Sequence, residues 1–80
     1  MMTTSRSKKY DSAFMLRVGS NLKARRKAAG YSQEYVMKLF GYRSNASIAK
    51  WEKGQYLPSF ETLHKLAELY GCTLDELLSP

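Results

Sequence analysis

The residues best suited to chemistry in this 80-residue chain are amides, hydroxyls and cations gathered between residues 43 and 56. Amides and hydroxyls donate and accept hydrogen bonds, while lysine and arginine offer donors with a positive charge. Together they suit recognition of a polyanion rather than bond breaking. The members of this set are Arg43, Ser44, Asn45, Ser47, Lys50, Lys53, Gln55 and Tyr56.

Catalytic and metal-binding groups are scarce by comparison. The chain has one cysteine, Cys72, and one histidine, His64, which excludes an intramolecular disulfide and any multi-cysteine zinc site. We interpret Cys72 as a small core residue and His64 as a packing or surface residue. No nucleophile is paired with a base, and no glycine-rich phosphate loop occurs. The sequence therefore predicts neither an enzyme nor a metal or cofactor site.

The charge is unevenly distributed along the chain. Residues 1–56 hold 12 of the 13 Lys and Arg residues but only three of the seven acids, so their net charge is +9. Residues 57–80 hold one lysine and four acids, a net charge of −3. This asymmetry predicts that the first part meets a polyanion. Nucleic acid is the first expectation and an anionic membrane surface the second, although the apolar helix faces are needed for a core.

The length and hydrophobic content of 44% predict one globular domain. No apolar run approaches the roughly 18 residues that span a bilayer. The first residues lack the apolar region of a secretory signal, so we expect a cytoplasmic protein. We interpret residues 1–11, with Arg6, Lys8 and Lys9, as a flexible basic tail, and residues 12–80 as the folded domain.

Capping residues and apolar periodicity predict an all-α fold that positions the polar stretch. Asp11 or Ser12, Ser32, Ser44 or Asn45, Ser59, and Thr73 are the expected caps. Glycine follows each of the first four helices. The predicted helices cover residues 12–29, 33–40, 45–53, 60–70 and 74–78.

Each predicted helix has an apolar face for the core. The third also has an outward face of small and basic residues, Ala46, Lys50 and Lys53, opposite an inward face with Ile48 and Glu52. An α-helix with such an outward face fits the DNA major groove. The expected core positions are Phe14, Met15, Val18, Leu22, Ala29, Val36, Leu39, Phe40, Ile48, Trp51, Phe60, Leu63, Leu66, Ala67, Tyr70, Leu74, Leu77 and Leu78.

Four segments at fixed spacing carry a resemblance to a known family: Gly30-Tyr31-Ser32-Gln33-Glu34, Ile48-Ala49-Lys50-Trp51-Glu52-Lys53-Gly54, Pro58-Ser59-Phe60-Glu61-Thr62-Leu63, and Gly71-Cys72-Thr73-Leu74-Asp75-Glu76-Leu77-Leu78. With them, residues 18–78 resemble the phage-repressor and Cro-type helix-turn-helix family, also called XRE-like. The resemblance implies a compact five-helix bundle in which the second and third helices form the helix-turn-helix. It also implies sequence-specific binding of double-stranded DNA as a two-fold dimer.

The resemblance also implies roles for individual residues. Gln33 matches a phosphate-contacting position, and the stretch Ser44, Asn45, Ala46 and Ser47 matches the part that enters the major groove. Asn45 could read adenine, or it could simply cap the third helix. Lys50 and Arg43 are expected to face DNA, or else water. The positions that follow the recognition helix and match backbone contacts are Lys53, Gln55 and Tyr56.

Arg26 and Glu52 match a structural ion pair that ties the first helix to the third. Arg25 departs from the family, since an apolar residue is usual there, and it could compete for Glu52. Met37 replaces a usual alanine where the second and third helices approach. The turn between Gly41 and Ile48 is one residue longer than usual, which leaves the register of the groove contacts open.

The expected function is transcription regulation, with repression the expected sign. A phage, plasmid or other mobile element of bacteria is the expected source, and the nucleoid the expected location. We expect a weak homodimer, strengthened on DNA, through apolar residues of the last helices: Leu69, Leu74, Leu77 and Leu78. The alternative is an antitoxin-like or other protein-interaction module that uses the same apolar residues to bind a protein partner.

Overall fold

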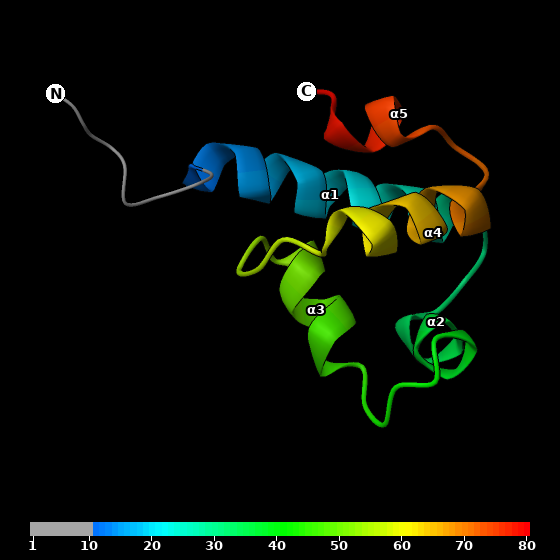
Figure 1. The fold of residues 1–80 in the computed structure, drawn as a ribbon. Helices are drawn as coiled ribbons and strands as arrows, with labels where there is room; N and C mark the ends of the chain where they lie inside the picture. The colour runs from blue at the N-terminus through cyan, green and yellow to red at the C-terminus, as the bar shows by residue number, and fades with distance from the viewer. Residues whose placement is uncertain (1–10) are drawn as a thin grey trace, which may run out of the picture.

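A computed structural model describes residues 11–80, and the proposed basic tail before Asp11 lies outside these residues. Within them the chain forms five helices and no strand, which confirms the all-α prediction. Figure 1 shows α2 and α3 on one side of α1 and α5 on the other. The elements are α1 (Ser12–Ala28), α2 (Gln33–Leu39), α3 (Ala46–Glu52), α4 (Phe60–Tyr70) and α5 (Leu74–Leu78).

Side-chain caps begin four of the helices. The side chains of Asp11, Ser32, Ser59 and Thr73 each accept a hydrogen bond from the backbone N–H three residues later. Thr73 also forms a reciprocal capping box with Glu76. These bonds explain why the helix starts follow from local sequence.

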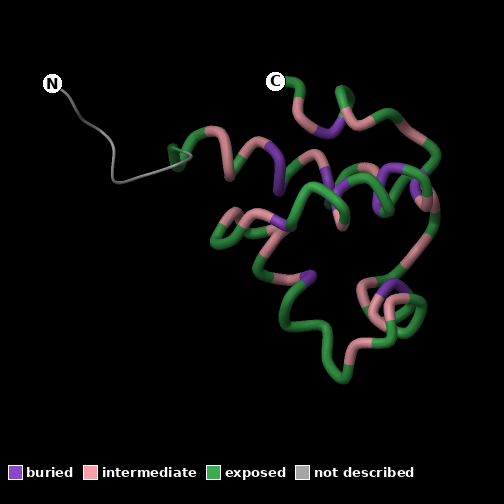
Figure 2. Tube along the Cα trace, viewed as in Figure 1, coloured by how far each residue is buried: buried purple, intermediate pink, exposed green. Residues whose placement is uncertain are grey.

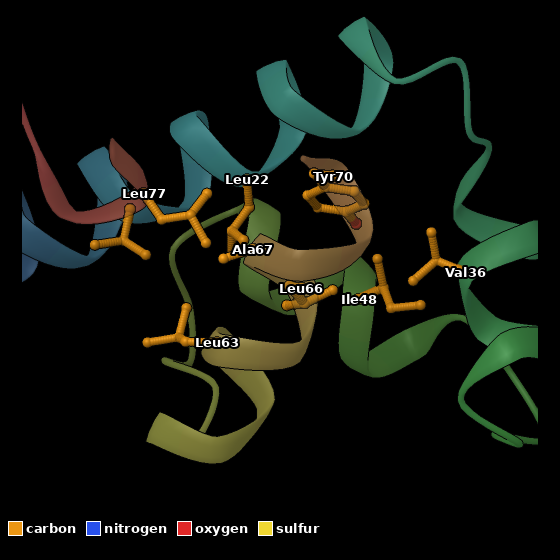
Figure 3. Close-up of a cluster of buried hydrophobic side chains, with 9 residues drawn as sticks. Leu22, Val36, Ile48, Leu63, Leu66, Ala67, Tyr70 and Leu77 are labelled. Atoms are coloured by element: carbon orange, nitrogen blue, oxygen red, sulfur yellow. The ribbon is translucent and has the colours of Figure 1, made fainter. Parts of the chain in front are cut away.

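The core lies where α1 crosses α3, α4 and α5 (Figures 1 and 3). Every helix contributes at least one side chain, and α2 packs chiefly against α3. Figure 2 shows that buried positions alternate with exposed ones along the helices. The buried hydrophobic residues are Val18, Leu22, Val36, Ile48, Leu63, Leu66, Ala67, Tyr70 and Leu77.

Two predicted core residues are exposed, which corrects the sequence interpretation. Phe60 is 71% exposed and Leu39 is 51% exposed. Both have the correct helical phase, but they lie at helix ends, Phe60 first in α4 and Leu39 last in α2. Helical phase shows which side of a helix faces the core. A residue on that side is buried only if a neighbouring element extends over its turn.

The crossing of α1 and α3 depends on a residue that sequence reasoning did not single out, Gly19. A Cβ atom at this position would lie 2.5 Å from the carbonyl oxygen of Trp51 and 2.8 Å from that of Glu52. The carbonyls belong to the C-terminal turn of α3, so the two backbones approach too closely for any side chain. Gly54 repeats the arrangement, since its Cβ would lie 2.9 Å from Cα of Leu16.

We expect Gly19→Ala to lower the free energy of unfolding by about 1–3 kcal/mol, because the new methyl group displaces backbone rather than a flexible side chain. The loss should appear even though alanine is the better helix former by about 1 kcal/mol. Ser20→Ala, at the exposed neighbouring position, is the matched control and should change stability little. Urea unfolding of both variants measures the difference, and equal midpoints would contradict the close crossing.

Two polar contacts fasten α5 to α1. The amide of Asn21 donates to the carbonyl oxygens of Leu77 and Ser79, at 2.9 and 2.6 Å. Arg25 pairs with Glu76 at 3.4 Å, with both side chains partly exposed. The pKa of Glu76 is lowered, first by the backbone N–H of Thr73 and then by Arg25. Arg25 therefore binds α5, and the competition for Glu52 does not arise.

Candidate nucleic-acid interface

The turn between α2 and α3 is built around Gly41. Its φ of +74° lies in the left-handed region, which glycine adopts at little cost. The N–H of Gly41 donates to the carbonyl of Lys38, and that of Tyr42 to the carbonyl of Met37, which ends α2 in a Schellman motif. Residues 43–47 are exposed, and Figure 2 shows that most of the connection between α2 and α3 is exposed. The longer turn therefore displays its polar side chains to solvent.

Arg26 and Glu52 form a bidentate ion pair beneath α3. Nε of Arg26 donates to Oε2 of Glu52 at 2.7 Å, and Nη2 donates to Oε1 at 3.0 Å. The two side chains are only 8% and 4% exposed. Nη1 of Arg26 also donates to the carbonyl of Tyr31, at 2.8 Å. The guanidinium thus joins α1, the loop before α2, and the last residue of α3.

Glu52 has a second partner at the start of α2. Nε2 of Gln33 donates to Oε1 of Glu52 at 2.9 Å. Oε1 of Gln33 then accepts from Nδ2 of Asn45, at 3.1 Å. A continuous chain of hydrogen bonds therefore runs from the buried ion pair to the exposed residue in front of α3.

The ion pair favours the charged form of Arg26. The hydrogen bond from Arg26 to Glu52 raises the pKa of the guanidinium. Burial, and next the Glu52 carboxylate, raise the pKa of the nearby Tyr70 hydroxyl, so this group stays neutral. A neutral phenol beside the carboxylate leaves Arg26 as its charge partner.

Asn45 occupies the N-cap position of α3 without capping it. Its side chain makes no cap hydrogen bond. Instead, the Oγ atom of Ser44 accepts from the N–H of Ala46, at 3.3 Å. The sequence left open whether Ser44 and Asn45 cap the helix or face a ligand. In the structure Ser44, rather than Asn45, bonds to the helix backbone. Ser44 accepts a hydrogen bond from the helix backbone, and the Asn45 amide, which donates to Gln33, is exposed at the surface.

The outward side of α3 is exposed along its length. Ala46, Ser47 and Lys50 are exposed, whereas Ile48 between them is 1% exposed. Nζ of Lys50 lies 5.4 Å from the ring centre of Tyr56, a cation–π contact. Lys53, Gln55 and Tyr56 are exposed after the helix.

The predicted site residues thus lie along the start of α2, the turn, the outward side of α3 and the loop that follows it. All are exposed except Gln33, which is half-buried because it reaches Glu52. Sequence reasoning missed the bonds of Gln33 to Glu52 and Asn45. A helical wheel gives phases within one helix, and no such signal places residue 33 beside residue 45 across a turn of unusual length.

Groups suited to other chemistry do not assemble here. Within residues 11–80 no three His, Cys, Asp or Glu side chains could hold a metal ion, and no helix is long and apolar enough to cross a membrane. Burial raises the pKa of the half-buried Cys72 thiol, which disfavours its reactive thiolate form. His64 is exposed on α4.

Comparison with known proteins agrees with this geometry. Residues 22–77 match the helix-turn-helix family model HTH_3. The DNA-binding domain of BldD is similar in structure, with a TM-score of 0.76 and 27% identity over 88% of this chain and 100% of that one. The restriction-modification controller protein C.AhdI from Aeromonas hydrophila gives a TM-score of 0.71 and 31% identity, over 81% and 97% of the two chains.

A curated relative shares more sequence but is much longer. The HTH-type transcriptional activator BcrR of Enterococcus faecalis is 38% identical over 64 residues, which make up 80% of this chain and 26% of that protein. Since the family model spans most of the described residues, the family is established. The chain belongs to the helix-turn-helix family of the XRE type.

Proposed function

We propose that this protein binds a specific operator sequence by inserting α3, about residues 45–53, into the major groove as a two-fold dimer. The observation that carries the proposal is the division of α3 into a buried and an exposed side. Ile48 and the Glu52 side chain anchor the helix, while Ala46, Ser47 and Lys50 face solvent with no element of residues 11–80 over them. A major groove about 12 Å wide accepts such a helix.

The residues proposed to contact DNA divide into two roles. Asn45 and Ser47 sit at the N-terminal end of α3 and are proposed to contact base edges, with Ala46 allowing close approach. Phosphate contacts are assigned to the remaining donors, which flank the helix on both sides. These are Gln33, Arg43, Ser44, Lys50, Lys53, Gln55 and Tyr56.

Protection of a selected DNA site tests this docking. A two-fold dimer should protect two half-sites whose centres are about 34 Å, one helical turn, apart. Premethylation of guanine N7, which lies in the major groove, should block binding inside the half-sites. The proposal would be contradicted if only methylation of minor-groove positions blocked binding. It would also be contradicted if saturating protein protected a single half-site.

The contact between two copies does not include every residue of the apolar face first expected on the last helices, Leu69, Leu74, Leu77 and Leu78. Leu77, the middle residue of that predicted face, is fully buried against α1, because α5 folds back onto the core. A second apolar feature lies at the start of α4. The exposed Phe60 lines a cavity of about 160 Å³. The other residues that line this cavity are Phe14, Leu57, Pro58, Leu63 and Leu78.

We propose that Phe60 of each copy fills this cavity of the other. A two-fold contact is self-complementary. The Phe60 ring of each copy can therefore enter the cavity of the other, so that the same contact forms twice. The patch is small compared with the roughly 2,000 Å² or more of obligate dimers. A weak dimer that DNA strengthens is the expected consequence.

Phe60→Ser should therefore shift DNA binding from cooperative dimers toward single half-site occupancy, with little change in the monomer's melting temperature. Its high exposure means that folding gains little from this ring. Leu39→Ser is the matched control, since Leu39 is also an exposed apolar residue but lies on α2. Sedimentation and two-site binding curves measure the effect. An unchanged dimerisation constant for Phe60→Ser would place the dimer contact elsewhere.

For the sign of regulation we propose repression, because a DNA-bound domain blocks an overlapping promoter without further contacts. The relative BcrR is named an activator, but this chain matches only 26% of it. A reporter driven by a promoter that overlaps the selected site should fall on expression of the protein, and a rise would reverse the sign. Access to such promoters requires a cytoplasmic, nucleoid-associated location.

A further inference from the structure

The loop after α3 is fixed at its first residues by backbone hydrogen bonds and by α1. The N–H of Gly54 donates to the carbonyl of Trp51 at 3.1 Å. The N–H of Gln55 donates to the carbonyl of Lys50 at 2.9 Å, which completes a Schellman motif. Gly54 has a φ of +77° and lies against α1, since its Cβ would be 2.9 Å from Cα of Leu16. The loop therefore leaves α3 in a defined direction.

This direction brings the ring of Tyr56 beside the ammonium of Lys50. Nζ of Lys50 lies 5.4 Å from the ring centre, within the range of a cation–π contact. Among residues 11–80 no acidic side chain forms a salt bridge with Lys50. Both side chains are exposed. The ring is therefore the group that attracts the Lys50 ammonium on the outward side of α3.

We infer that Tyr56 is a positioning residue, which holds Lys50 for a phosphate contact and keeps it from reading a base. This role rests on the proposed docking of α3 in the major groove. Side chains of a helix lean toward its N-terminus, so a released Lys50 would extend toward Asn45 and Ser47, where base contacts are proposed. The contact with Tyr56 keeps the ammonium beside the loop, where phosphate contacts are proposed.

The place of the ammonium decides what Lys50 recognises. At a phosphate, a lysine acts as a point charge and strengthens binding to every sequence. In the major groove, it donates to N7 and O6 of guanine and so distinguishes one base pair from the others. The ring face leaves N–H donors of the ammonium free for a phosphate oxygen. Tyr56 thus keeps the charge of Lys50 in use while it suppresses a preference for guanine.

Removal of the ring should create a new base preference. In Tyr56→Leu the residue stays apolar but has no ring face to hold the ammonium. We expect this variant to gain a preference for guanine at one base pair, about fivefold or more, that the wild type lacks. The gain should vanish when Tyr56→Leu is combined with Lys50→Ala, because no ammonium remains to contact the base.

A conservative variant separates the ring from its hydroxyl group. Tyr56→Phe keeps the ring face, so it should select the wild-type sequence. The phosphate contact proposed for the hydroxyl would be lost, which should weaken binding to all sequences alike.

Tyr35→Leu is the matched control. Tyr35 is an exposed tyrosine of α2 that stacks on Tyr31, with 4.9 Å between the ring centres, rather than on a lysine. Its variant should select the wild-type sequence. Selection from random DNA identifies the base pair, and affinities for sites that differ only there measure the preference. Melting curves should show that every variant is folded.

Three results would overturn the inference. If Tyr56→Leu selects the wild-type sequence, or keeps a new guanine preference without Lys50, Tyr56 does not position this lysine. If Tyr56→Phe gains the guanine preference, the ring face is not what holds the ammonium. If Lys50→Ala alone loses a guanine preference, Lys50 already reads a base in the wild type. Failure of the wild type to select any sequence would instead contradict the proposed function itself.

Discussion

Glu52→Ala is expected to lower the free energy of unfolding by about 3–5 kcal/mol, the usual cost of removing one partner of a buried ion pair. The reason is the burial of Arg26, whose side chain is 8% exposed and donates twice to Glu52. Without the carboxylate, the guanidinium keeps only the carbonyl of Tyr31. The loss is a large part of the roughly 4–12 kcal/mol expected for 80 residues.

Urea unfolding measures this loss, and a double-mutant cycle assigns it. Glu52→Ala combined with Arg26→Ala should be strongly non-additive, whereas the combination with Arg25→Ala should be additive. Arg25 is the matched arginine, one residue away and paired with Glu76 on the surface. Glu76→Ala should cost much less than Glu52→Ala, since its side chain is 48% exposed. Additivity with Arg26→Ala would contradict the buried pair.

DNA affinity is expected to fall by about 10³–10⁵-fold between 50 and 200 mM salt, if the dimer contacts six to ten phosphates. The basis is the concentration of exposed cations around α3, with Arg43 before it and Lys50 and Lys53 at its end. Each neutralised phosphate releases bound counterions, so the slope of log affinity against log salt counts the contacts. A slope near zero would show that the basic side does not meet the DNA backbone.

Lys53→Ala tests the salt dependence of DNA affinity at a single residue. It should weaken binding to all sequences alike and reduce the salt slope by about one for each phosphate that is no longer neutralised. Lys65→Ala is the matched control, because Lys65 is exposed on α4 and approaches Glu61 at 4.0 Å. Its slope should equal that of the wild type. Equal effects of the two substitutions on the salt slope would show that net charge, rather than a phosphate contact next to α3, determines the affinity.

The parts of the fold that the sequence predicted are those set by local interactions. Caps such as Ser32 and Ser59 bond to backbone within one turn, and Gly41 adopts a positive φ. These choices depend on neighbours in the sequence, so the five helices could be placed within a residue or two. Helical phase predicted the exposure of Ala46, Lys50 and Lys53 in the same way, whereas the family resemblance supplied most of the other site residues.

The parts that it could not predict depend on how separate elements meet. The exposure of Phe60 and the requirement for glycine at position 19 both arise where two helices cross or fail to cover each other. The link between Gln33 and Asn45 also spans two helices. Periodicity carries no information on these distances.

The most direct test of the central claim, that α3 reads DNA, is selection from random DNA by the wild type and by a variant with exchanges at Asn45, Ala46, Ser47 and Lys50. All four residues are exposed, so the variant should fold normally. We expect the wild type to enrich a two-fold sequence, and the variant to enrich a different one or none. If the variant selects the same sequence with the same affinity, α3 is not the recognition helix.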